Sequence, residues 1–322
     1  MMTSILIAIA AGAASALMFA SVISGSLISV VLMYLAPLPL LVTALGWGPF
    51  AAAIGGIAAA IGLGLVVGFS YMIAFALWAA LPAWWLGRLI LLGRPVESAT
   101  VVPASPDDAQ TLEWYPIGRI LLWIAAFASL ITMGTLLTLG SDAETIQAAL
   151  RRGLMRMLGP RVAEAEGARG LGNLMTILAP AAGTLGTLIA LTLNVWLAAK
   201  IARTSGRLNR PWPDIKSTAL PPMTLAALSA AIAFCFTGGL LAIASQIVSA
   251  ALMTAYAVTG FATLHTVTLA LKSRGLWLSF AYATVMVFGW PVIVMAIVGL
   301  ADAVFGFRQR FMQRHRPAVP TT

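Results

Sequence analysis

Two ionisable side chains lie inside long apolar stretches and are the residues best placed to do chemistry. His265 ends the run YAVTGFATLH, and Asp302 lies within GLADAVFGFR. Ionisable groups are costly in apolar surroundings, so those present mark ligand contacts, proton paths or paired structural charges. Asp302 precedes Arg308 by six residues, which favours a salt bridge or an anchor at a helix end over a proton relay. His265 is interpreted either as a hydrogen-bonded or snorkelling side chain or as a ligand contact.

Uncharged polar side chains in the apolar stretches form a second group of candidates. Asn194 lies in TLIALTLNVWLAAK, and Gln246 lies in the apolar run 217–271. Such side chains commonly hydrogen-bond to neighbouring helices, and they also line binding cavities. We take Asn194, Gln246, His265 and Asp302 as the candidate polar groups of a small-molecule site. Tyr71, Asn173 and Tyr256 share these properties.

The motifs of several enzyme classes are missing from the sequence. Its one adjacent acidic pair, Asp107-Asp108, lies in a proline-rich stretch without the repeat that a Mg²⁺-pyrophosphate site needs. Cys235 is the single cysteine, so a disulfide framework and a thiolate metal site are excluded. There is no P-loop, no His-x-x-x-His pair and no dinucleotide-binding glycine motif. We expect a non-enzymatic protein with no catalytic residues, no metal and no cofactor.

The composition shows what kind of element must carry these residues. The chain has 322 residues, of which 61% are hydrophobic and 9% charged, with a mean hydropathy of +0.97. A soluble domain carries about a quarter charged residues. The net charge of +9 comes from Lys and Arg scattered over short polar segments and the C-terminal end, as in membrane-flanking loops, and does not indicate nucleic-acid binding. The sequence therefore predicts an all-α, polytopic integral membrane helical bundle in contact with lipid.

Apolar runs of about 20 residues predict the membrane spans. The predicted spans cover 3–23, 27–45, 49–68, 70–92, 117–140 and 173–199, two spans in 217–271 divided near Gly238-Gly239, and 276–304. The first run is interpreted as a retained helix rather than a signal peptide. Breaks are expected at Ser24-Gly25-Ser26, Gly46–Pro49 and Gly68–Ser70, and a kink at Pro37 and Pro39. The distribution of Lys and Arg does not orient nine spans, so eight or nine remain open.

The spans group into a single membrane-embedded domain, 1–322. It comprises a four-helix block at 1–92, a polar loop at 93–116, a C-terminal helical block at 117–307 and a basic disordered tail at 308–322. Within the C-terminal block, 141–160 predicts an amphipathic helix that begins with a capping box of Ser141 and Glu144. This helix lies either at the lipid headgroups or across the end of the bundle.

Small residues recur at every fourth position in two of the predicted helices. They are Ala8, Gly12, Ala16 and Ala20 in the first, and Gly48, Ala52, Gly56, Ala60, Gly64 and Gly68 in the third. Helices in lipid associate through close backbone approach, which small residues permit. The stripes therefore predict tight helix packing, either inside the bundle or against a partner membrane protein.

A resemblance to a known family rests on four stretches of the sequence. They are the N-terminal Ala-x-x-x-Ala helix, LAPLPLLVTALGWGPFAAAIGG at 35–56, YAVTGFATLH at 256–265 and GLADAVFGFR at 299–308. The chain resembles the YybS-like family, domain of unknown function 2232, which is grouped with the S components of energy-coupling-factor transporters. The resemblance implies an S-component-like N-terminal part, a vitamin-like ligand and a bacterial inner-membrane location. It also implies that the first-helix stripe docks onto a transmembrane coupling subunit with an ATPase. The alternative is a scaffold or assembly factor in envelope biogenesis without a small-molecule ligand.

Overall fold

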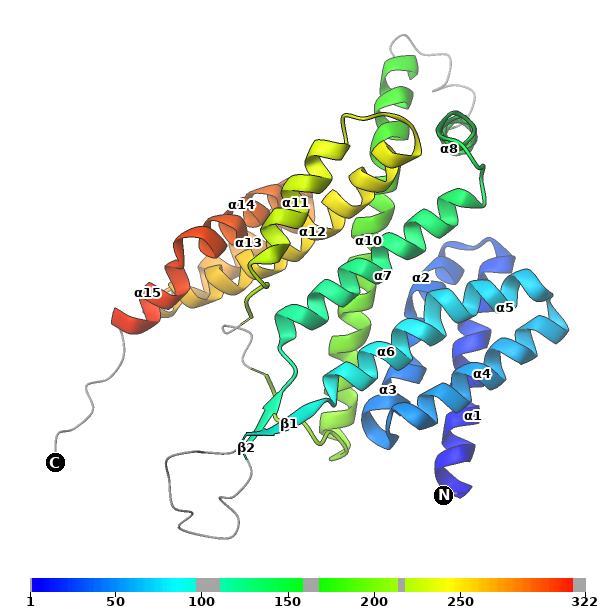
Figure 1. Ribbon diagram of the computed structural model, residues 1–322, viewed down its shortest axis with the longest axis horizontal. Coiled ribbons are helices and arrows are strands. Elements are labelled where there is room, and N and C mark those ends of the chain that lie inside the picture. Colours follow the sequence, from blue (N-terminus) through cyan, green and yellow to red (C-terminus); the bar gives the residue numbers. More distant parts are fainter. Residues whose placement is uncertain (1, 97–110, 159–167, 214–217, 315–322) are drawn as a thin grey trace. The chain divides into compact units, whose positions relative to one another are not determined.

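The computed structural model describes residues 2–96, 111–158, 168–213 and 218–314 (Figure 1). Almost all of these residues are helical, so the all-α prediction is confirmed. The chain forms two compact units, which are described separately. Unit 1 comprises residues 1–127 and 189–212, and unit 2 comprises 128–188 and 213–322.

Unit 1 begins with apolar helices that match the four predicted spans of 1–92. They are α1 (Met2–Ala20) with a 3₁₀ turn (Ser21–Ser24), α2 (Leu27–Leu35), α3 (Pro37–Trp47), α4 (Pro49–Val66), α5 (Phe69–Phe75), a π-helical segment (Ala76–Ala80) and α6 (Leu81–Ile90). Gly25, Gly48 and Gly68 separate the spans, with φ values of 66°, 99° and 132°. Glycine adopts positive φ without the steric cost of a Cβ atom, so these predicted breaks are confirmed.

The second predicted span is interrupted at Pro37, between α2 and α3, where proline cannot continue the backbone hydrogen-bond ladder. Two fully buried side chains donate hydrogen bonds to carbonyls at this break. The Ser15 hydroxyl donates to the Ala36 oxygen (2.5 Å), and the Asn194 amide donates to the Tyr34 oxygen (2.7 Å). The kink is thus a buried polar junction that is held from two other helices.

The polar loop predicted at 93–116 is corrected at both ends, where two short strands pair. Strand β1 (Gly93–Val96) lies antiparallel to β2 (Thr111–Trp114), with Gly93 opposite Trp114. Arg94 and Glu113 form a cross-strand salt bridge of 2.6 Å. The local sequence is rich in proline and charge, so it did not predict strands; the stabilising pair joins residues far apart in the sequence.

Arg210 fastens this hairpin to the loop that follows α10 (Ala168–Thr204). Its guanidinium donates hydrogen bonds of 3.0 Å to the carbonyl oxygens of Ile90 and Tyr115, on either side of the two strands. Burial lowers the pKa of Arg210 from its ordinary value. The next helix along the chain, α7 (Ile117–Leu137), begins two residues after Tyr115 and, like α10, contributes to both units.

Unit 2 is organised around α12. Its described helices are α8 (Ala143–Leu158), α11 (Met223–Phe234), α12 (Gly239–Val267) with a 3₁₀ turn (Thr268–Ala270), α13 (Arg274–Phe288), α14 (Pro291–Phe305) and α15 (Phe307–Arg314). Figure 1 shows α11, α12 and α14 side by side, and α12 packs against both of the others. It is the most buried of the apolar helices that are long enough to span a membrane.

Helix α8 matches the predicted amphipathic segment but begins one residue later than the capping box required. Asp142, not Ser141, caps it: Asp142 Oδ1 accepts from the Thr145 amide (2.8 Å) and Oδ2 from the Thr145 hydroxyl (2.6 Å). These hydrogen bonds lower the pKa of Asp142. Ile146 is fully buried in a cluster with Leu136, Ile243 and Ile247, so α8 packs across the ends of other unit 2 helices.

Seven helical segments of the described residues are long and apolar enough to cross a bilayer, against the eight or nine predicted. The difference lies in two places. Helix α11 has 12 residues, about 18 Å at 1.5 Å per residue, which is shorter than the hydrocarbon core. The predicted span 276–304 is two helices of 15 residues each, α13 and α14, because Gly289 has a positive φ of 69° and Pro291 starts a new helix. The helices remain those of a multi-pass membrane protein.

Candidate functional site

A glycine crossing in unit 2 brings α12 and α14 into backbone contact. A Cβ atom added to Gly260 would overlap the Met295 carbonyl oxygen, and one added to Gly299 would overlap the Tyr256 carbonyl oxygen. Close approach of this kind lets dispersion and weak Cα–H···O contacts hold two helices in lipid. The crossing therefore fixes where the nearby side chains of the two helices lie relative to one another.

The C-terminal end of α14 carries a buried ion pair between Asp302 and Arg308. Gly306 ends the helix with a φ of 64°, and the chain turns back on itself. Asp302 Oδ1 then accepts the Arg308 backbone N–H (2.8 Å), and Oδ2 accepts from Arg308 Nε (2.5 Å). The salt bridge predicted from the six-residue spacing is confirmed, and the carboxylate also caps the first turn of α15.

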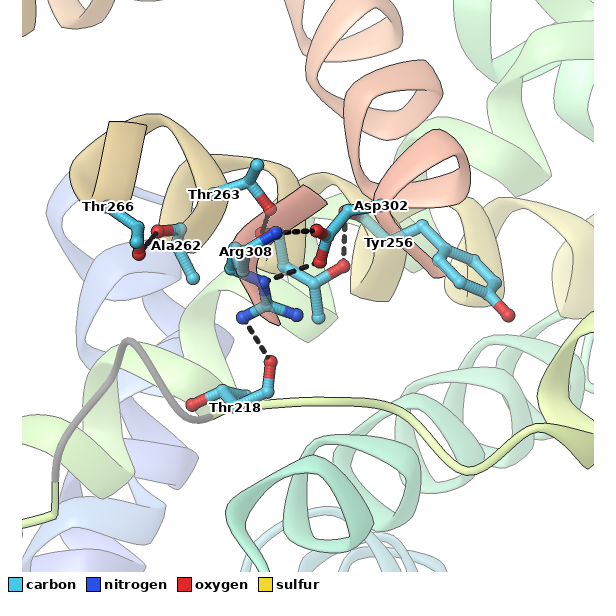
Figure 2. Close-up of polar contacts among 8 residues, drawn as sticks. Thr218, Tyr256, Ala262, Thr263, Thr266, Asp302 and Arg308 are labelled. Carbon is cyan, nitrogen blue, oxygen red and sulfur yellow. Dashed lines mark hydrogen bonds and ion pairs between the residues drawn. The ribbon is translucent and has the colours of Figure 1, made fainter. Parts of the chain in front are cut away.

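This ion pair is further tied to the segment that leads into α11. Figure 2 shows the Arg308 side chain between Asp302 and Thr218, and Arg308 Nη1 donates to the Thr218 carbonyl oxygen (2.7 Å). The side chains of Arg308 and Asp302 are 8% and 4% exposed. The prediction of a disordered tail from residue 308 is therefore corrected: 307–314 form α15, because the buried pair anchors its first turn. Residues 315–322 lie outside the described residues.

A cavity of about 870 Å³ opens beside the ion pair. Its walls combine polar groups with apolar ones. They come from Ala219, Leu220, Pro221, Pro222 and Leu225 before and in α11, Tyr256 and Thr259 in α12, Gly299 and 302–306 in and after α14, and Arg308, Gln309 and Arg310 in α15. The Thr259 hydroxyl donates to the Tyr256 carbonyl (2.8 Å), so this wall is fixed from within α12.

The geometry at Asp302 suits binding rather than proton transfer. The carboxylate accepts two hydrogen bonds from one arginine and is shielded from solvent, so both of its oxygens are engaged in one fixed ion pair. Among the residues that the structure describes, no group of three or more His, Cys, Asp and Glu side chains is placed to hold a metal ion.

His265 lies on α12 in a different cluster. Its Nε2 is 2.9 Å from the Tyr282 hydroxyl, and its Nδ1 is 3.5 Å from Arg274 Nη2. Tyr282 stacks on Phe261 with ring centroids 5.1 Å apart. These contacts favour the hydrogen-bonded interpretation of His265, with Nδ1 accepting from the arginine and Nε2 donating to the tyrosine.

The other two polar candidates do not line the cavity. Asn194 is fully buried in unit 1, where its amide binds the Tyr34 carbonyl and its Oδ1 has no hydrogen-bond partner among the described residues. Gln246 is half-buried on α12, beside the fully buried Ile247. The four predicted site residues are thus at separate positions, and Asp302 alone faces the cavity.

The small-residue stripes follow the helical repeat less closely than counting in fours suggests. In α1 the buried face is Ala8, Gly12, Ser15 and Phe19, while Ala16 and Ala20 are half-buried. In α4 the residues Ala52, Gly56 and Ala60 are buried, Gly64 touches Met72 of α5, and Gly48 and Gly68 are helix-end residues with positive φ. A repeat of 3.6 residues turns a four-residue stripe steadily away from the contact face.

The closest contact in unit 1 involves a residue outside the predicted stripe. Gly55 meets α1: a Cβ atom on Gly55 would overlap the Ala8 carbonyl oxygen, and one on Gly12 would overlap the Gly55 carbonyl oxygen (Figure 1 places α1 beside α4). Gly56 instead faces Ala80, 3.0 Å from a Cβ placed on it. The sequence feature that could have predicted this contact is the adjacent pair Gly55-Gly56, because two neighbouring glycines allow α4 to pack closely against two different segments.

Comparison of the chain with family models, with curated proteins and with solved structures finds no match.

Proposed function

We propose that this protein is a non-enzymatic multi-pass membrane protein that binds a small molecule in the cavity beside Asp302 and Arg308. The observation that carries the proposal is the cavity itself, about 870 Å³ with polar and apolar walls. Ligand pockets commonly measure about 300–1,000 Å³ and combine apolar walls with a few fixed polar groups. The Gly260–Gly299 crossing and the buried ion pair supply that fixed frame.

Transport is the form of binding that the YybS-like resemblance favours. An S-component-like protein would take a vitamin-like metabolite from one side of a bacterial inner membrane and rely on a separate coupling subunit with an ATPase. Ala8 and Gly12, the stripe residues that the resemblance assigns to docking, lie against Gly55 of α4. A coupling subunit would therefore contact α1 on a face other than the one with Ala8 and Gly12.

The proposal is tested by thermal unfolding of the detergent-purified protein with a panel of vitamins and anionic metabolites. A ligand at 100 times its Kd stabilises the folded state by about 2.7 kcal/mol, which raises Tm. Replacing Ala303, which lines the cavity, by Trp should abolish the shift. The matched variant Ile297→Trp, on the exposed side of the same helix, should keep it.

A panel that leaves Tm unchanged would count against ligand binding. If the same preparation captured envelope-assembly proteins, the scaffold alternative would replace the transporter. A shift that survives in Ala303→Trp would place the ligand elsewhere in the molecule.

A further inference from the structure

Cationic side chains gather at one end of unit 1, where four apolar helices end or begin. Helix α3 ends at Trp47, α6 at Ile90 and α10 at Thr204, and α7 begins at Ile117. The loop after α10 joins these ends. Arg210 bonds to the Ile90 and Tyr115 carbonyls, and Arg207 Cδ lies 3.6 Å from the Cβ position of Gly46. The ends of the four helices therefore lie at one level of unit 1.

At this level four exposed cations each lie over a tryptophan ring, as the buried Arg210 does over Trp114, and we name the four exposed cations the basic rim. The pairs are Arg207 over Trp47 (4.5 Å to the centroid), Arg203 over Trp212 (4.9 Å), Lys200 over Trp196 (5.8 Å) and Arg88 over Trp85 (6.0 Å). All four cationic residues are exposed. Because these side chains are exposed, their N–H donors can also bind groups in the surroundings.

The basic rim has little countercharge within the described part of unit 1. The acidic side chain described there is Glu113, and it pairs with Arg94 at 2.6 Å. Within the described residues of unit 1, Arg88, Lys200, Arg203 and Arg207 therefore outnumber the acidic side chains. A surface of this kind attracts an anion rather than completing an internal ion-pair network.

We propose that the basic rim binds the phosphate groups of anionic phospholipids. Two observations select a lipid over a soluble acidic partner. The cations lie at the ends of candidate membrane spans, which sets them at the depth of the headgroups. They also alternate with tryptophan rings, which prefer the membrane–water boundary. Arginine forms bidentate hydrogen bonds to phosphate oxygens, so Arg203 and Arg207 are the expected principal contacts.

The experiment uses the full chain in vesicles that mix phosphatidylcholine with phosphatidylglycerol, one of the two carrying brominated acyl chains. Quenching of tryptophan fluorescence, summed over the ten tryptophans of the chain, reports which lipid lies next to the protein, and the variants below isolate the contribution of the basic rim. We expect the wild-type protein to be quenched more by brominated phosphatidylglycerol, and the preference to weaken as salt is raised. The double variant Arg203→Ala/Arg207→Ala should reduce the relative affinity about fivefold for each cation removed.

The matched control is Arg94→Ala/Glu113→Ala, which makes two substitutions at the same end of unit 1 without changing its net charge. It should keep the wild-type preference. Equal quenching of the wild-type protein by the two lipids overturns the proposal without any variant, and so does a preference unchanged in Arg203→Ala/Arg207→Ala. Full competition by inorganic phosphate at constant ionic strength would indicate a free-phosphate site instead. Binding of an acidic peptide without lipid preference would indicate a soluble partner.

Discussion

At the scale of single residues, the Arg308 guanidinium is the neighbour that neutralises Asp302 below the protein surface. Removing one partner of a buried ion pair leaves the other charge without compensation, which costs about 3–5 kcal/mol. We therefore expect Arg308→Met to lower the free energy of unfolding by about that amount. Asp302→Asn/Arg308→Met, which removes both charges, should be milder. Denaturant unfolding in mild detergent, followed by circular dichroism, measures both variants.

The comparison of the two variants separates charge from packing. Should Arg308→Met and Asp302→Asn/Arg308→Met lose the same stability, the cost lies in the lost side-chain volume and the Thr218 hydrogen bond rather than in an unpaired carboxylate.

Gly55 gives a second test at residue scale, because its contact is with backbone rather than with a movable side chain. A Cβ atom there would overlap the Ala8 carbonyl oxygen, so α1 and α4 would have to separate. Overpacking of this kind costs about 1–3 kcal/mol. Gly55→Ala should accordingly lower Tm in detergent.

Gly62 on the same helix is the control, since nothing lies within 4 Å of its Cβ position. Gly62→Ala should be neutral or stabilising, by up to about 1 kcal/mol from helix propensity alone. If Gly55→Ala and Gly62→Ala lowered Tm equally, the loss could not be attributed to the contact between Gly55 and α1.

At the scale of helices, the cap of α8 responds to pH. The hydrogen bonds from Thr145 lower the pKa of Asp142 below its ordinary value of 3.8. A depressed folded-state pKa adds stability that is full above the unfolded value and is lost as pH falls through the folded one. Amide exchange over 143–158, corrected for intrinsic rates, should therefore accelerate as pH falls below about 3.8 in the wild-type chain.

Two variants identify the capping residue. Asp142→Asn keeps an acceptor for the Thr145 amide and has no carboxyl to protonate, so its exchange should not change with pH over this range. Ser141→Ala should behave like the wild-type chain. If Ser141→Ala instead accelerates exchange and Asp142→Asn keeps the pH response, the helix begins at Ser141.

How much of the fold follows from the sequence also differs from helix to helix. The four spans of 1–92 could be predicted from glycine breaks and from the length of the apolar runs, because both depend only on residues that are close together in the sequence. The division into α13 and α14 was missed since Gly289 and Pro291 also occur in helices that only bend. Strands β1 and β2 pair residues that are distant in the sequence, from Gly93 with Trp114 to Val96 with Thr111, so no local pattern predicts them. For the site, the spacing of Asp302 and Arg308 predicted their pairing, but the cavity needs α11, α12, α14 and α15 brought together.

At the scale of the whole molecule, the β1–β2 hairpin and the loop after α10 lie on the same side of any membrane that unit 1 spans. Arg210 joins the loop after α10 to both sides of the hairpin. Ser24 lies at the other end of the second span, a full helix length from Trp47, which contacts this loop through Arg207. The described Lys and Arg side chains of unit 1, taken without unit 2, gather at this end. Lys and Arg accumulate on cytoplasmic loops, so we expect the hairpin and the 205–212 loop to face the cytoplasm.

Single cysteines in a Cys235→Ser background test this orientation in cells that express the chain. Arg94→Cys and Ser205→Cys should resist a membrane-impermeant maleimide until the cells are permeabilised. Ser24→Cys should react in intact cells, because one span separates it from the basic end. If one of Arg94→Cys and Ser205→Cys reacted in intact cells and the other did not, the result would contradict the packing of unit 1 described above. Reaction of both in intact cells, with Ser24→Cys protected, would keep that packing but turn the basic rim toward the outside, where it could not meet the phosphates of a cytoplasmic leaflet.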